Sequence, residues 1–486
     1  MEFNAFDLYE TERLMSEESD ADAFISKITS LNLTVHAVIV DDYRLGRSWE
    51  RKIYSTIRGP LIAFDDVARH HYCDLIIDSR WEGAKTLSRY NGKTHDKTIM
   101  LLGPSYTMVG AEYHKPSYIN CEKKHKQRVV ISIGGGGRLS FISDIVSEFL
   151  NIKDNFEHIE VYVVVGPYTS VQPELSDLSN SHKNIFLYEN HESIYPLLKE
   201  ADLFVGAAGG TLYEALILQV PCLTFSISKN QENERRYLED LGHYFHLGFI
   251  DDCKVHDIAQ LMHIMLEKMV RLKKLYSIPP RIVIDNLGVD RVCSHVTALI
   301  KGYDQPDVSS YPLIDELLTQ DQSYDFCAVN DQMVNKYLEA RNLEKNLRNM
   351  TIKTQISHLA HYIWWLNDNR RESYVLKKGG IERLFIWHQV VTFSDKKVLI
   401  GGWFVSSDDC GPIDVFSAME KQLNLTDDKY SKIPWVAVIH RFNKFVQLMN
   451  RRFGFFEISK SHSLYHVAKQ SFPSASENDF LFFARA

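Results

Sequence analysis

ADLFVGAAGGTLYEALILQVP, residues 201–221, gives the clearest indication of the fold class of this 486-residue chain. It opens with a continuous apolar run, passes through a glycine-rich turn, continues with a helical pattern and ends at a proline that leads a second apolar run, PCLTFSI. Strands that are apolar on both faces are typical of parallel sheets covered by helices. The stretch therefore predicts a strand, a turn, a helix and a second strand of a doubly wound α/β layer.

The glycine turn of this stretch is a candidate phosphate site. The amide groups of Gly209, Gly210 and Thr211 would open the helix and face a diphosphate. Glu214, one turn further on, could accept hydrogen bonds from both hydroxyls of a ribose. An alternative needs no ligand, because Thr211-x-x-Glu214 has the spacing of a capping box that satisfies the amide groups of the helix itself. On the residues alone, both interpretations stay open.

A second glycine turn, ISIGGGGRLS at residues 131–140, also follows a strand-like run. Its glycines, Gly135 and Gly136 among them, would let the backbone approach a ligand closely and direct amide groups at phosphate. The spacing is not G-x-G-x-x-G, so it does not indicate a dinucleotide site. The alternative is a tight turn between a strand and a helix that binds nothing.

Further apolar runs extend the α/β pattern along the chain. VHAVIVD, PLIAFD and CDLIID predict short parallel strands before the glycine turns. A stretch rich in Pro, Asp and Ser after residue 302 indicates a linker, and the later residues, richer in Trp, His and Asn, predict an α+β unit. The predicted divisions are a partial Rossmann-like domain at 1–120, a second Rossmann-like domain at 121–302, a linker at 303–328 and a third domain at 329–486.

The composition excludes several classes of function. With 55 Lys and Arg against 63 Asp and Glu, the net charge is -8, which does not favour nucleic acid as a partner. Polar residues and glycines interrupt the longest apolar window, so no membrane span is predicted, and the amino terminus has no secretory signal pattern. Seven widely spaced cysteines indicate neither a disulfide framework nor a zinc site. We expect a cytoplasmic protein without a metal.

Several motifs occur in the order of a known family. They are VIVDDYRLGRSWE, LIAFDDVARHHYCDLIID, LLGPSYTMV, ISIGGGG, VVVGP, the stretch at 201–221 and KNQ. Over residues 15–290 the chain resembles the UDP-2,4-diacetamido-2,4,6-trideoxy-β-L-altropyranose hydrolases of pseudaminic acid synthesis, which are similar to MurG-type glycosyltransferases. The resemblance implies a GT-B-like pair of Rossmann-type domains, the first one incomplete, with a nucleotide sugar in the cleft between them and no cofactor.

The resemblance also implies which residues hold this substrate. It puts Gly209, Gly210 and Thr211 at the diphosphate, Glu214 at the ribose, and Asn230 and Gln231 near the sugar and phosphates. Tyr106 of LLGPSY would contact the sugar, although a buried structural tyrosine is the alternative at this position.

One departure from the family concerns catalysis. The hydrolases open with a Gly-x-Gly-His-x-x-Arg loop whose histidine activates the attacking water, and this sequence does not contain that loop. Three explanations stand: a start codon placed downstream of the true one, a domain that binds the nucleotide sugar without hydrolysing it, or a replacement base. The candidate bases are His70, His71, His114, His182 and His191, each of which could instead be an ordinary core or surface histidine.

The carboxy-terminal part resembles the GNAT acyltransferases. WVAVIHRFNKFVQLMNRRFGFFEI has their order of strand, Asn443, helix and Gly-Phe, and residues 340–366 are similar to the N-acetyltransferase of the pseudaminic pathway. The resemblance implies acetyl-CoA as cofactor. Where the family holds the pyrophosphate on R/Q-x-x-G-x-G/A, this chain offers Gly411 alone; Asp408 and Asp409 would repel the phosphates, and Pro412 supplies no N–H. The alternative is a GNAT-shaped module used for packing or for binding a partner.

Together these features predict a two-part enzyme of nonulosonic acid or related surface-glycan synthesis, flagellin glycosylation included. Its first part would bind and hydrolyse a UDP-sugar, and its second part would resemble an N-acyltransferase. The alternatives are a GT-B glycosyltransferase and a non-catalytic remnant that binds a UDP-sugar. Because an incomplete parallel sheet has exposed edges, we also expect a partner protein or an oligomer that covers them.

Overall fold

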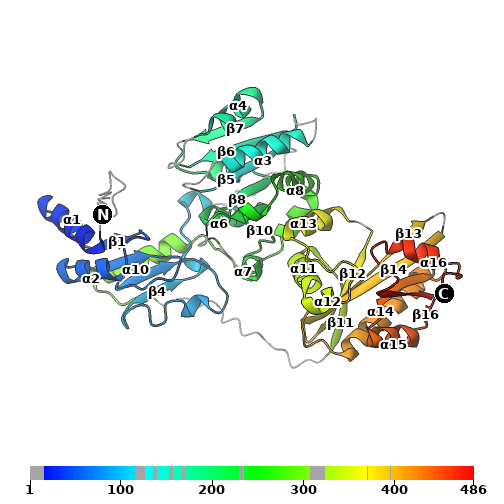
Figure 1. Ribbon diagram of the computed structural model, residues 1–486. Helices are drawn as coiled ribbons and strands as arrows, with labels where there is room; N and C mark the ends of the chain where they lie inside the picture. Colours follow the sequence, from blue (N-terminus) through cyan, green and yellow to red (C-terminus); the bar gives the residue numbers. More distant parts are fainter. Residues whose placement is uncertain are drawn as a thin grey trace. The chain divides into compact units, whose positions relative to one another are not determined.

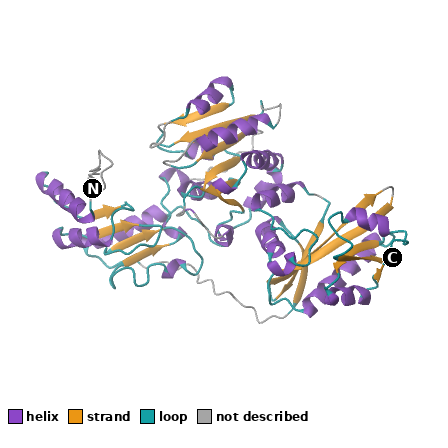
Figure 2. Ribbon diagram, in the orientation of Figure 1, coloured by secondary structure: helices purple, strands orange, loops and turns teal. Residues whose placement is uncertain are grey.

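In the computed structural model, whose helices and strands Figure 1 labels, the chain divides into two units. The structure describes residues 16–114, 126–134, 140–152, 157–166, 171–189, 191–228, 231, 235–306, 323–368, 370–393 and 396–486. The first unit takes the described residues of Met1–Lys254 and Met269–Ile314, and the second those of Val255–Lys268 and Asp315–Ala486. Figure 2 shows that the first unit contains two separate sheets flanked by helices.

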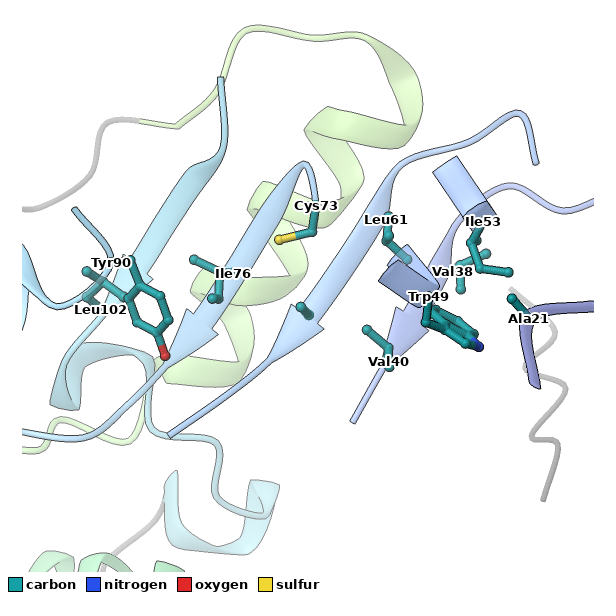
Figure 3. Close-up of a cluster of buried hydrophobic side chains, with 11 residues drawn as sticks. Ala21, Val38, Val40, Trp49, Ile53, Leu61, Cys73, Ile76, Tyr90 and Leu102 are labelled. Atoms are coloured by element: carbon teal, nitrogen blue, oxygen red, sulfur yellow. The ribbon is translucent and has the colours of Figure 1, made fainter. Parts of the chain in front are cut away.

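The first sheet has four parallel strands in the order β1-β2-β3-β4. They are β1 (Val38–Val40), β2 (Leu61–Phe64), β3 (Leu75–Asp78) and β4 (Ile99–Leu102). Helices α1 (Glu17–Ser30) and α2 (Arg47–Thr56) cover one face, where Trp49 lies beside Val38 and Val40 in a core cluster that extends to Ile76 (Figure 3). Because neighbouring residues of a strand point to opposite faces, Leu75 and Ile77 form a separate core on the other side.

The second sheet has six parallel strands in the order β10-β9-β8-β5-β6-β7. The strands are β5 (Gln127–Ser132), β6 (Ile159–Val165), β7 (Ile185–Glu189), β8 (Leu203–Ala207), β9 (Cys222–Ser226) and β10 (Phe245–Phe249). The helices along this part are α3 (Ser140–Asn151), α4 (Pro173–Ser181), α5 (Tyr195–Leu198), α6 (Gly210–Ile217), α7 (Arg235–Asp240) and α9 (Met269–Tyr276). This is the 3-2-1-4-5-6 strand order of a doubly wound fold, as the apolar runs predict.

The helix α10 (Gly288–Lys301) belongs to the first sheet, although the sequence suggests a second domain that continues to residue 302. Its Val292 packs with Leu75 and Ile77 beneath that sheet. The approach is close at the start of the helix, because a Cβ on Gly288 would lie 2.1 Å from the carbonyl oxygen of Thr107. The chain therefore returns to the first sheet after it has completed the second.

The second unit is built on one mixed sheet of seven strands in the order β11-β12-β13-β14-β15-β17-β16. They are β11 (Tyr324–Ala328), β12 (Glu372–Lys378), β13 (Ile381–Phe393), β14 (Lys396–Val405), β15 (Trp435–His440), β16 (Phe456–Glu457) and β17 (Phe480–Arg485). Its helices are α8 (Val255–Glu267), α11 (Val334–Asn342), α12 (Glu344–Leu347), α13 (His358–Asn367), α14 (Pro412–Tyr430), α15 (Lys444–Arg452) and α16 (Tyr465–Ser471), and α8 lies against α13. The predicted architecture, two α/β parts followed by an α+β part, is confirmed.

Across the part of the chain that the structure describes, none of the helices combines the length and the apolar character that a bilayer crossing requires.

Candidate functional site

Both glycine turns follow strands at the centre of the second sheet. Strand β5 pairs with β8. The strands that follow β5 in the chain extend the sheet on one side of this pair, and those that follow β8 extend it on the other. The two strands are in close contact, because a Cβ on Gly206 would lie 1.9 Å from the carbonyl oxygen of Ser132. In open α/β sheets, ligands bind at the carboxyl ends of the strands where the strand order reverses. The turn after β8 lies at that point, whereas Gly135 and Gly136, which follow β5, lie outside the described residues.

The helix α6 begins at the glycines, and its first turn is open. Gly209 is the N-cap with extended backbone and without a side-chain hydrogen bond, and Gly210 is the first helical residue. Apart from its chain neighbours and the backbone of α6 itself, none of the described residues has a heavy atom within 4 Å of the position that a Cβ on Gly210 would take. Thr211 lies inside the helix and is not the N-cap, so the capping box with Glu214 does not form. The first amide groups of the helix therefore remain available to an anion.

Gln231 lies beside this turn. Its Oε1 accepts a hydrogen bond of 3.0 Å from the amide of Ile227, and its backbone oxygen accepts one of 3.0 Å from Ser226 Oγ. With the side chain held in this way, its Nε2 lies 3.7 Å from the position of a Cβ on Gly209. The structure thus brings Gln231 and the start of α6 together, and Asn230 lies outside the described residues.

Glu214 lies on the second turn of α6, half-buried and incompletely paired. Burial, and then the charge of Glu112, raise the pKa of its carboxyl group to about 7, and the hydroxyl of Tyr113 counteracts this shift. That hydroxyl acts on the carboxylate but forms no regular hydrogen bond with any of the described residues. A carboxylate in this state can accept hydrogen bonds from two ligand hydroxyls without losing a strong partner in the protein.

Tyr106 does not join this group. It is 2% exposed, and it belongs to the apolar core between the first sheet and α10. Its ring meets the imidazole of His295 edge-on, with 6.3 Å between the ring centroids. This placement favours the structural alternative for Tyr106, and its contact with a sugar stays a prediction.

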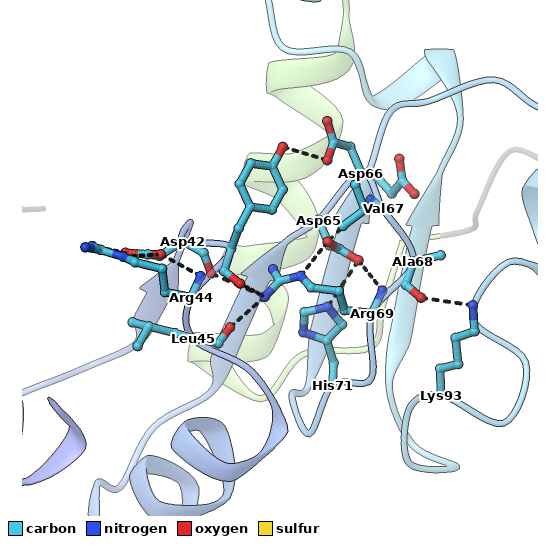
Figure 4. A network of polar contacts seen from close by, with 12 residues as sticks. Asp42, Arg44, Leu45, Asp65, Asp66, Val67, Ala68, Arg69, His71 and Lys93 are labelled. Carbon is cyan, nitrogen blue, oxygen red and sulfur yellow. Dashed lines mark hydrogen bonds and ion pairs between the residues drawn. The ribbon is translucent and has the colours of Figure 1, made fainter. Parts of the chain in front are cut away.

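His71, one of the candidate bases, is fixed inside the first sheet's domain (Figure 4). Its side chain is fully buried, with Nδ1 2.6 Å from Glu50 Oε1 and Nε2 3.3 Å from Asp65 Oδ2. Burial alone would lower the pKa of His71, but the neighbouring carboxylates of Asp65 and Glu50 raise it to about 9. A protonated, enclosed imidazole cannot take a proton from water, so His71 has a structural role.

The other candidate bases are not brought to the turn after β8 by any described contact. His182 Nδ1 lies 3.1 Å from the carbonyl oxygen of Leu178, and His191 stacks on Tyr188 beside strand β7. His70 is exposed, and the side chain of His114 lies outside the described part of the chain. The structure assigns none of these residues to the activation of water.

A cavity of about 610 Å³ lies in the second unit, where two parallel strands diverge. Strands β14 and β15 pair at Leu399 and Trp435 and then separate, and residues of both strands line the cavity. Asn443 also lines it and caps α15, because its side chain accepts a hydrogen bond of 3.2 Å from the amide of Val446. The predicted order of strand, Asn443 and helix is therefore present.

The amino terminus of α14, where an acyl-CoA pyrophosphate is expected, is already occupied by a carboxylate of the chain. Gly411 donates its amide hydrogen to Asp414 Oδ2 at 2.8 Å, and Pro412 has no N–H to offer. Burial alone would raise the pKa of Asp414, but hydrogen bonds from Tyr324 and Gly411 and the charge of Arg383 hold it below its usual value. An ionised Asp414 at this position repels phosphate, so these residues do not fit the pyrophosphate.

Comparison with known proteins finds relatives of the first part of the chain. No family model matches. An uncharacterized protein of Methanocaldococcus jannaschii is 26% identical over 199 residues, which are 39% of this chain and 40% of that protein. The UDP-2,4-diacetamido-2,4,6-trideoxy-β-L-altropyranose hydrolase of Campylobacter jejuni is 26% identical over 209 residues, 42% of this chain and 72% of the hydrolase. The resemblance to the hydrolase family is confirmed at modest identity. The chain spans about two fifths of the Methanocaldococcus protein.

Solved structures similar to the chain fall into two groups. A UDP co-structure of Staphylococcus aureus MnaA is 12% identical, covers 62% of this chain and 83% of its own and has a TM-score of 0.41. The ribosomal L7/L12 N-acetyltransferase RimL in complex with coenzyme A is 10% identical, covers 35% of this chain and 95% of its own and has a TM-score of 0.27. Because both TM-scores are low, the assignment of the fold rests on the strand orders of the chain's own sheets.

Proposed function

We propose that the first unit binds a UDP-sugar and hydrolyses its anomeric C–O bond, releasing UDP and a free 2,4-diacetamido-2,4,6-trideoxy sugar. One observation carries the proposal: the open start of α6, the side chain of Gln231 and the half-buried Glu214 lie together at the switch point of a doubly wound sheet. The similarity to the Campylobacter jejuni hydrolase supports the choice of sugar and a place in pseudaminic acid synthesis. Roles in surface polysaccharide synthesis and in flagellin glycosylation are parts of this proposal.

Each part of the nucleotide has a complementary group in this arrangement. The amides of Gly210 and Thr211 donate to the diphosphate, where the partial positive charge of the helix start is greatest. The Nε2 of Gln231 is a further donor beside them. Glu214, on the second turn, accepts hydrogen bonds from the ribose hydroxyls in its ionised form, so UDP binding should strengthen as the pH rises through about 7.

The proposed reaction is a displacement at the anomeric carbon. A water oxygen forms a bond to that carbon, the bond from the carbon to the UDP oxygen breaks, and UDP leaves with the electron pair. The proton of the water passes to a general base. His71 is not this base, because its side chain is buried in ion pairs with two carboxylates. Donors at the diphosphate stabilise the negative charge that develops on the leaving group.

UDP binding is tested by thermal unfolding of the whole chain. A ligand present at 100 times its dissociation constant stabilises the folded state by about 2.7 kcal/mol. We expect UDP to raise the unfolding temperature of the wild type and not that of Glu214→Ala. The control Glu174→Ala removes an exposed carboxylate from α4 and should respond to UDP like the wild type. A folded wild type without any response to UDP would contradict the proposal.

A glycosyltransferase is the second candidate. The processive diacylglycerol β-glucosyltransferase of Bacillus cereus is 28% identical to the chain over 122 residues, 24% of this chain and 30% of that enzyme. Release of UDP only in the presence of an acceptor would favour a transferase. Binding of UDP-sugar without any turnover would instead indicate a non-catalytic remnant.

For the second unit, the GNAT resemblance implies an amino-sugar N-acyltransferase with acetyl-CoA. The cavity lined by β14 and β15 can hold a small molecule, whatever its chemical class. The carboxylate of Asp414 at the start of α14 does not fit the pyrophosphate of the cofactor, and we therefore propose no acyl-transfer step.

A further inference from the structure

The cavity of the second unit is positively charged. Among the described residues that line it are two arginines, and none of its lining residues is Asp, Glu or Lys. Burial lowers the pKa of His361 in this lining to about 4, so the positive charge comes from the arginines. Arg341 is engaged by the backbone, because its guanidinium donates to the carbonyl oxygens of Ile352 and Thr354 at 2.9 and 3.0 Å. Arg371 has no such partner at its Nε, which is buried without a hydrogen bond among the described residues. Arg371 therefore brings a cation to a cavity whose described lining contains no carboxylate, with its Nε–H unpaired among the described residues.

Two indole rings hold the guanidinium of Arg371. Its central carbon lies 3.7 Å from the ring centroid of Trp387 and 4.9 Å from that of Trp364. Stacking of this kind restricts the side chain and covers faces of the guanidinium that cannot form hydrogen bonds. The N–H groups point outward in the plane of the group, so a ligand can meet them only at the edge.

A second unpaired donor lines the same cavity. Trp435 is 5% exposed, and its Nε1–H has no hydrogen-bond partner among the described residues. The ring is fixed where β14 and β15 begin to separate, since a Cβ on Gly401 would lie 2.8 Å from it. Buried donors without partners are costly and rare, so two of them in one cavity indicate a ligand that supplies acceptors.

We propose that this cavity binds a small molecule through a carboxylate group, with Arg371 as its cationic anchor. A carboxylate is planar and presents two acceptor oxygens to the edge of a guanidinium, which is the pairing that arginine favours. Trp435 donates to a further acceptor on the ligand. An amine would find no carboxylate on the described walls to hold its charge. The proposal concerns the second unit alone and does not depend on UDP binding by the first.

The test uses tryptophan fluorescence of the full chain, because Trp364, Trp387 and Trp435 line the cavity. The probes are pairs that differ in charge: benzoate with benzamide, and glucuronate with glucose. Inorganic phosphate and acetyl-CoA are added as separate probes. We expect at least one acid to change the fluorescence in a saturable way and to bind more tightly than its neutral partner by about tenfold or more.

Variants of two adjacent arginines assign the effect. Arg371→Gln should weaken binding of the acid by about tenfold or more, and Arg371→Lys, which keeps the charge, should retain part of it. The control Arg370→Gln removes a neighbouring charge that is 82% exposed, and binding should be unchanged. Circular dichroism checks that each variant folds. If Arg371→Gln does not fold, the proposal is tested by two other results: the difference between acid and neutral partner in the wild type, and the binding of the acid by Arg371→Lys.

Four results would overturn the proposal. They are the absence of binding by every acid, equal binding of acids and neutral partners, phosphate or acetyl-CoA binding more tightly than any acid, and unchanged binding in a folded Arg371→Gln.

Discussion

Glu214→Gln should make the protein more stable and at the same time less able to bind UDP. The wild-type carboxyl is half-buried without a strong partner, and its pKa is about 7 against 4.5 for an ordinary glutamate. Between pH 4.5 and about pH 7, the folded state therefore keeps a proton on Glu214 that the unfolded state has released. Stability of the wild type falls as the pH rises from about 4.5 to 7, and the cost is then constant at higher pH.

The size of the effect follows from the difference between the two pKa values, 4.5 and about 7. At 1.36 kcal/mol per pKa unit, the ionised side chain costs the folded state about 3 kcal/mol at pH 8. At pH 5 most of the folded molecules carry a neutral Glu214, and the same calculation gives about 1 kcal/mol. Glutamine has the same shape and no charge, so the gain of Glu214→Gln should grow from about 1 to about 3 kcal/mol over this range.

Denaturant unfolding at pH 5 and pH 8 measures this gain in stability. The transition to follow is the one that added UDP shifts, because it reports on the unit that contains Glu214. The matched control Glu174→Gln also removes a carboxylate, but from an exposed position on α4, and its stability should follow the wild type at both pH values. If Glu214→Gln were no more stable at pH 8 than the wild type, the carboxyl group would not be poorly paired, and the physical reason for its availability to ribose would be lost.

Two further predictions concern the two sheets of the first unit. Gly206→Ala should fail to fold because its Cβ would lie 1.9 Å from the oxygen of Ser132, whereas Gly210→Ala, with open space at that position, should give a wild-type circular dichroism spectrum. For His71, the folded pKa of about 9 exceeds the usual 6.5, so its contribution to stability is complete below pH 6.5 and is lost as the pH rises through 9. His71→Gln should therefore be destabilised most at pH 6, with a smaller difference from the wild type at pH 10, and equal differences at both pH values in urea titrations would refute the assignment.

The strands and their parallel arrangement could be predicted from the sequence because their signal is local. Continuous apolar runs that end in glycine turns indicate buried strands at whatever distance their partners lie. The same local pattern does not reveal which sheet a helix covers. The apolar face of α10 does not name its partner sheet, and it is the packing of Val292 on Leu75 and the close approach of Gly288 to Thr107 that place the helix against the first.

The site could be predicted in part. The positions of Gly209, Gly210 and Glu214 follow from one strand and one turn, but the sequence does not show whether the helix begins at Gly209 or Thr211, and this choice decides between an open helix start and a capping box. The role of Asp414 has a sequence signal, because Gly-Pro-x-Asp places a carboxylate three residues after an N-cap.

Other features depend on contacts across long stretches of chain. The carboxylate of Glu50, which keeps His71 protonated, lies 21 residues away from it. Trp364 lies on α13, Arg371 directly precedes β12 and Trp387 lies on β13, at separations that follow no helix or strand period. No pattern in the sequence distinguishes them from ordinary core and surface residues.

The most direct test of the central claim is turnover of UDP-2,4-diacetamido-2,4,6-trideoxy-β-L-altropyranose in water labelled with oxygen-18, with mass spectrometry of early products. We predict release of UDP without any acceptor, with the label in the free sugar and none in UDP. Glu214→Ala should lose this release at substrate concentrations that saturate the wild type but not the variant. UDP release that needs an acceptor, label in the phosphate of UDP, or no release at all would contradict the claim that the first unit hydrolyses the anomeric bond of a UDP-sugar.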